Sequence, residues 1–84
     1  MNLTKIINGL RQTYTLIEEC PKNLFNGYTL AHVELAIEAL RVLDLRKAVN
    51  HLHSARNLIA DYCKNTPRGE QVLGYIENAI ESLQ

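Results

Sequence analysis

The chain of 84 residues is long enough for one small domain, residues 1–84, and too short for a separate catalytic domain. Hydrophobic residues make up 46% of the chain and charged residues 21%, a composition typical of a folded protein and unlike that of a disordered one. The 9 basic and 9 acidic side chains give a formal net charge of zero, which excludes a general electrostatic attraction to nucleic acid or to an anionic membrane.

No segment has the features of an export signal or of a membrane span. The first residues lead directly into amphipathic sequence, without the basic stretch and apolar block of a signal peptide. Uninterrupted apolar runs extend over only a few residues, whereas a bilayer requires about 20. Cys20 and Cys63 lack metal-binding spacing, and we expect them to be buried or idle thiols. These features predict a cytoplasmic protein that does not enter a membrane.

The first helix is predicted over residues 3–19. Apolar side chains recur there at helical spacing on one face: Leu3, Ile6, Ile7, Leu10, Tyr14 and Ile17. Gly9 lowers the helix propensity by about 1 kcal/mol, which indicates either close packing at this point or weak selection. Pro21 ends the helix because it disfavours helical geometry in the residue before it.

The segment 21–28 is predicted to be an irregular loop. Its Asn26-Gly27 pair is typical of a turn, because both residues tolerate positive φ angles. The same segment concentrates apolar side chains: Leu24, Phe25 and Tyr28. We expect these side chains to fold back over the end of the bundle, with binding of a partner as the alternative.

A second helix is predicted over residues 30–43, with Thr29 as its N-cap. It is apolar around roughly two thirds of its circumference, so it must be surrounded either by its own chain or by a partner. Its charged side chains share one narrow strip: Glu34, Glu38 and Arg41. Three residues are expected to face the core: Val33, Ile37 and Leu40. Three others form a surplus that is expected to stay exposed: Leu35, Ala39 and Val42.

A third helix is predicted over residues 45–64, with Asp44 as its cap. This break makes the second and third helices an antiparallel hairpin; one continuous helix is the alternative, because neither Gly nor Pro stands at the junction. Arg56 lies within the apolar face and requires a partner. The hairpin is expected to place it beside Glu34, where it either forms an ion pair or extends its charged end to solvent. The alternative is that Arg56 meets an acidic partner or a phosphate.

The last helix is predicted over residues 67–83, because Thr66 is a suitable N-cap and Pro67 suits the first helical position. Its core face is expected to consist of five residues: Val72, Ile76, Ala79, Ile80 and Leu83. No segment has the alternation of a strand. The sequence therefore predicts an all-α, compact four-helix bundle with a central helix hairpin.

The second and third helices resemble one tetratricopeptide hairpin. The similar positions are Leu35, Ala36, Ala48, Leu52 and Ala55. His32 and Ala39 stand where that family usually has large aromatics, Ala60 stands where it has a proline, and no second copy follows at the repeat period. The resemblance implies that the two helices pack through small residues and implies no ligand site.

No catalytic, cofactor or metal site is predicted. His51 and His53 lie about 200° apart around their helix and cannot share an ion, and His32 is expected to be isolated on the second helix. Neither cysteine has a nearby base, and no phosphate-binding loop is present. The carboxylates fall at solvated helix positions, so we expect the chain not to be an enzyme.

We expect a small protein–protein interaction module that self-associates or acts on a larger partner as an adaptor, regulator or inhibitor. Its interface is expected to combine the apolar surplus with the preceding loop: Leu35, Ala39, Val42, Leu24, Phe25 and Tyr28. One alternative is nucleic-acid binding through a basic side of the third helix: Arg46, Lys47, His53, Arg56, Lys64 and Arg68. A further alternative is a small ligand bound between subunits by Arg56 and nearby tyrosines.

Overall fold

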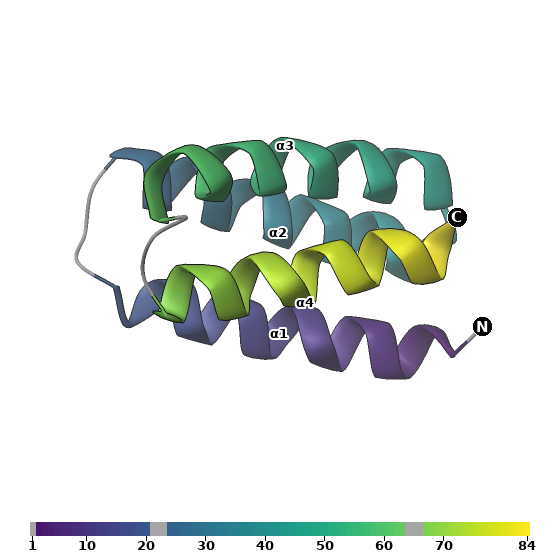
Figure 1. The fold of residues 1–84 in the computed structure, drawn as a ribbon. Coiled ribbons are helices and arrows are strands. Elements are labelled where there is room, and N and C mark those ends of the chain that lie inside the picture. The colour runs from purple at the N-terminus through teal and green to yellow at the C-terminus, as the bar shows by residue number, and fades with distance from the viewer. Residues whose placement is uncertain (1, 21–23, 64–66) are drawn as a thin grey trace.

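The computed structural model describes residues 2–20, 24–63 and 67–84, and for residues 24, 25 and 60–63 the description extends to the backbone only. Four helices, α1 (Leu3–Glu18), α2 (Leu24–Arg41), α3 (Leu45–Cys63) and α4 (Pro67–Leu83), account for nearly all of these residues (Figure 1). No strand occurs in the described part of the chain. The predicted all-α four-helix architecture is confirmed.

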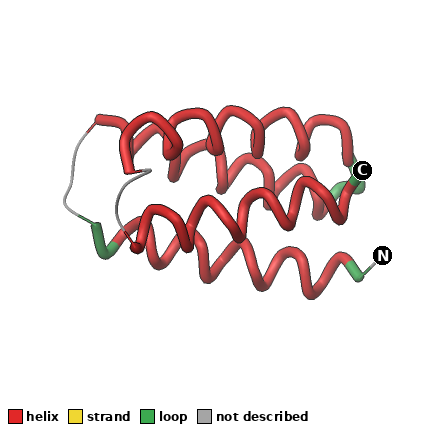
Figure 2. The backbone as a smooth tube through the Cα atoms, in the orientation of Figure 1, coloured by secondary structure: helices red, strands yellow, loops and turns green. Residues whose placement is uncertain are grey.

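The helices run up and down around a common core. Each helix contacts the helix before and after it in the chain, and α4 also contacts α1, so the four form a closed ring. Both termini and the turn between α2 and α3 lie at the same end of the bundle (Figure 2). The bundle measures 31 × 19 × 18 Å, and α2 and α3 share its most extensive contact.

The core follows the apolar spacing of each helix, as the sequence predicts. Among the residues whose side chains are described, sixteen hydrophobic ones are buried: Leu10, Ile17, Val33, Ala36, Ile37, Ala39, Leu40, Ala48, Leu52, Ala55, Ile59, Val72, Ile76, Ala79, Ile80 and Leu83. Burial of each of the larger aliphatic side chains stabilises the fold by roughly 1.5–3 kcal/mol before entropy is counted. Alanines are concentrated in α2 and α3, where small side chains allow two helices to approach closely.

Helix α2 begins at Leu24, so the predicted loop is wrong for residues 24–28 and Thr29 is not an N-cap. Asn26 and Thr29 are buried and continue the inward face of the helix at three- and four-residue steps before Val33. Both residues are polar, which made the first turns of α2 resemble a turn in sequence. Gly27 is helical, and no described glycine has a positive φ angle.

The junction between α2 and α3 is a tight turn at Leu43 and Asp44, which confirms the predicted break. The backbone N–H of Leu43 donates to the carbonyl of Leu40 (3.1 Å), and that of Asp44 donates to the carbonyl of Ala39 (2.9 Å). This pair of bonds is the Schellman motif, which requires a left-handed residue; Leu43 supplies it with a φ of 60°. The Asp44 side chain then caps α3 by accepting from the Lys47 N–H at 3.1 Å.

Candidate interaction surface

A row of exposed apolar side chains follows α2 along the outside of the bundle. Tyr28 is 54% exposed, Leu35 is 39% exposed and Val42 is 75% exposed. They recur every seven residues, so Tyr28 and Leu35 share one side of α2, and Val42 comes directly after the last residue of the helix, Arg41. We call these three residues the α2 stripe. Leu43, in the turn, extends the exposed apolar surface at one end.

The remaining predicted interface residues do not belong to the α2 stripe. Ala39 is 4% exposed, so its predicted exposure is wrong. Helical periodicity places Ala39 and Leu35 on the same side of α2, but it does not say where the neighbouring helix lies. In the structure Ala39 belongs to the buried core. The side chains of Leu24 and Phe25 lie outside the described residues, and their place in a loop is wrong because both belong to α2.

Two histidines meet beside the α2 stripe. His32 lies one turn from both Tyr28 and Leu35 on α2, and its Nδ1 is 3.1 Å from the Nδ1 of His51 on α3. The ring centroids are 5.3 Å apart and the rings are tilted by 35°. The prediction that His32 is isolated is therefore wrong. Sequence spacing cannot reveal this pair, because the residues come from different helices and their proximity depends on the register of the hairpin.

The environment of His51 disfavours its charged form. Burial lowers the pKa of His51, and the positive charges of His32 and Lys47 lower this pKa further. His51 and His32 are both half-buried, so the pair remains in contact with solvent. The shared hydrogen bond requires one Nδ1 to donate and the other to accept, because two protonated nitrogens would repel each other.

A groove with a volume of about 390 Å³ lies between α1 and α2, where the charged side chains of α2 are located. Its lining residues carry charges of both signs: Arg11, Tyr14, Thr15, Glu34, Ile37, Glu38 and Arg41. Glu34 therefore faces α1. Arg56 is half-buried on α3, and although both residues are described, no ion pair joins it to Glu34. The predicted pairing is wrong, because helical periodicity alone did not fix the direction in which Glu34 points.

The basic residues on and after α3 do not form one uniform surface. Arg46 and Lys47 are exposed, whereas His53 and Arg56 are half-buried. Arg68 forms an ion pair with Glu19 at 3.5 Å, and both side chains are largely exposed. Lys64 lies outside the described residues. Nucleic-acid binding through these basic residues stays a prediction. One of them, Arg68, already lies beside the carboxylate of Glu19.

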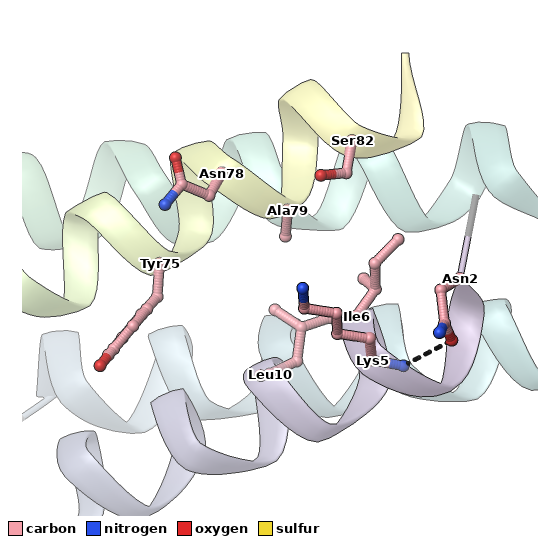
Figure 3. Close-up of a pocket in the computed structure, with 9 residues that line it drawn as sticks. Asn2, Lys5, Ile6, Leu10, Tyr75, Asn78, Ala79 and Ser82 are labelled. Atoms are coloured by element: carbon pink, nitrogen blue, oxygen red, sulfur yellow. Dashed lines mark hydrogen bonds between the residues drawn. The ribbon is translucent and has the colours of Figure 1, made fainter.

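A second groove, of about 490 Å³, lies between α1 and α4 (Figure 3). Polar side chains of Lys5, Tyr75 and Asn78 surround an apolar floor that includes Leu10 and Ala79. Gly9 lines this groove, and a Cβ built on it would meet nothing within 4 Å, so the glycine does not serve close packing. Arg56 does not line the groove, and a ligand site that combines it with tyrosines stays a prediction.

Other reactive side chains are sparse in residues 2–20, 24–63 and 67–84. No group of three or more His, Cys, Asp or Glu side chains is arranged to hold a metal ion within these ranges. Cys20 is a half-buried free thiol whose Sγ lies 3.4 Å from the Leu16 carbonyl oxygen, and the side chain of Cys63 is not among those described. None of the described helices is long and apolar enough to cross a bilayer.

Comparison of the chain with protein family models, with curated proteins and with solved structures gave no match.

Proposed function

We propose that this protein is a small, non-catalytic protein–protein interaction module that self-associates through the α2 stripe. The observation that carries the proposal is the exposure of Tyr28 and Leu35 on one side of α2, with Val42 exposed directly after the helix ends, while the opposite side of α2 is buried. Isolated exposed apolar residues are ordinary on protein surfaces, but large apolar residues that recur along one side of a helix are typical of an interface. Composition adds the expectation that the module acts in the cytoplasm, as an adaptor, regulator or inhibitor.

The spacing of the α2 stripe suits the packing of one helix against another. Apolar residues repeated every seven positions form the seam along which helices pair. Leu35 lies midway between Tyr28 and Val42. If two copies of α2 pack antiparallel about an axis at Leu35, each Tyr28 faces the Val42 of the other copy, so one surface complements itself. This symmetry favours self-association over binding of an unrelated partner.

Sedimentation velocity across the micromolar range tests the proposal. We expect the wild type to form dimers as its concentration rises and Leu35→Glu to remain monomeric, because a buried carboxylate at the centre of the seam would have no partner. Tyr75→Glu is the matched control, since Tyr75 is 37% exposed on α4, away from the α2 stripe. A wild type that stays monomeric, or a Leu35→Glu variant that still dimerises, contradicts self-association through this surface.

A further inference from the structure

The His32–His51 pair joins the middle of α2 to the middle of α3 through two ring nitrogens. Two Nδ1 lone pairs facing each other at 3.1 Å repel unless an electrophile lies between them. A proton on one Nδ1 is one such electrophile. A metal ion bound by both nitrogens is the other, because neutral imidazole is a common ligand of transition metals.

The separation of the nitrogens suits a shared metal ion. Zinc binds histidine nitrogen at about 2.0–2.1 Å, so two nitrogens of one tetrahedral zinc lie about 3.3 Å apart. The observed 3.1 Å is close to this separation. To bind one tetrahedral ion, each ring must turn so that its Nδ1 lone pair points about 35° away from the line between the nitrogens. The rings are half-buried, so an ion between them can retain water as its further ligands.

The backbone holds the two histidines in place. Val33 follows His32 and Leu52 follows His51, and both of these neighbours are completely buried. Their burial fixes the rotation of α2 and α3 about their own axes, so the imidazoles face each other before any ligand arrives. A site whose ligands are already positioned costs less entropy to assemble on binding.

We propose that His32 and His51 form a two-nitrogen site for a divalent transition metal of the class that prefers imidazole, namely zinc, copper or nickel. The donors are nitrogens, which disfavours calcium and magnesium because those ions prefer oxygen ligands. Lys47 opposes an added cation at this site, and because its side chain is exposed, water and salt reduce this opposition without removing it. This proposal does not depend on self-association.

Calorimetric titration of tag-free protein with zinc, followed by thermal unfolding, tests the site. We expect one zinc per chain and a rise in Tm of roughly 10 °C when zinc exceeds its Kd a hundredfold, because the ion ties α2 to α3. His32→Gln and His51→Gln should each weaken binding by more than about tenfold, since even the loss of a side chain that only orients a metal ligand costs that much. Circular dichroism checks that both variants keep their helices.

His53→Gln is the matched control, because His53 also lies on α3 but about 200° around the helix from His51. This variant should bind zinc as the wild type does. Electron paramagnetic resonance of the wild type loaded with one copper(II) per chain provides a check that needs no variant, and it should show two nitrogen ligands. Absence of zinc binding, a copper spectrum with one nitrogen or none, or equal loss in His53→Gln would overturn the proposal.

Discussion

The α2–α3 and α1–α4 contacts both contain small residues but differ in how closely they are packed. Ala36 on α2 and Ala48 and Ala55 on α3 are completely buried in the most extensive helix contact of the bundle. In contrast, Gly9 on α1 faces an open groove against α4. Small residues therefore bring one pair of helices together and leave space between the other pair. The comparison implies that added volume should be harmful on the α2–α3 side and tolerated on the α1–α4 side.

Ala55→Leu gives the largest expected effect. Ala55 is completely buried, so the added carbons must displace neighbouring side chains or separate the helices. We expect the free energy of unfolding to fall by about 1–3 kcal/mol in urea denaturation. Asn57→Leu is the control at an exposed position of the same helix, and it should change stability by less than about 0.5 kcal/mol. Equal effects of the two substitutions would contradict close packing around Ala55.

Leu43→Gly tests the turn that closes the α2–α3 pair. Leu43 has a φ of 60°, a conformation that costs a residue with a Cβ about 1–2 kcal/mol. Glycine avoids this cost but adds conformational entropy to the unfolded chain, so we expect a net stabilisation of about 0.5–1 kcal/mol. The neighbouring Val42→Gly should act in the opposite direction, because Val42 is not in the left-handed region. A loss of stability in Leu43→Gly would show that the exposed leucine makes contacts that outweigh its strain.

Gly9→Ala tests the open side of the comparison. A Cβ on Gly9 meets nothing within 4 Å, so alanine should gain its helix propensity, about 0.5–1 kcal/mol, without a steric cost. Gly74→Ala on α4 has equally free space and does not line the groove, so it should give a similar gain. Thermal unfolding of both variants measures the difference. Stabilisation by Gly74→Ala together with destabilisation by Gly9→Ala would mean that α1 and α4 pack more closely than the groove indicates.

The helices were predictable because their apolar residues recur with helical spacing, and the cap at Asp44 was predictable from residue type. The start of α2 was not, because Asn26 and Thr29 occupy inward positions that sequence analysis assigns to apolar residues. Their burial depends on tertiary contacts, which outweigh local turn propensity.

The candidate site was only partly predictable for a different reason. The exposure of Leu35 and Val42 follows from the surplus of apolar residues on α2. The burial of Ala39, the absence of an Arg56–Glu34 pair and the contact between His32 and His51 all depend on how α3 is rotated and shifted against α2. The apolar pattern of a single helix contains no information on this register, because the register is set by the tight turn and by side-chain packing across both helices.

The smallest expected effect is a dependence of the folding stability on pH that arises from His51, at the contact between α2 and α3. The folded protein holds the pKa of His51 below its ordinary value of about 6.5, whereas the unfolded chain does not. The unfolded state therefore binds more protons as the pH falls through this range, so stability is complete above about pH 6.5 and declines as the pH falls through the folded pKa. Chemical denaturation between about pH 7.5 and 5.5 measures the decline, in a range where carboxylates remain ionised.

His51→Gln should flatten this profile, because it removes the group whose pKa is lowered by folding. The groups that act on His51 are His32, across from it on α2, and Lys47, one turn earlier on α3. Lys47→Gln should therefore reduce the slope, since removal of its charge brings the pKa of His51 closer to that of the unfolded chain. A profile that is equally steep in the wild type and in His51→Gln would place the titrating group elsewhere and leave the histidine pair without a role in coupling α2 to α3.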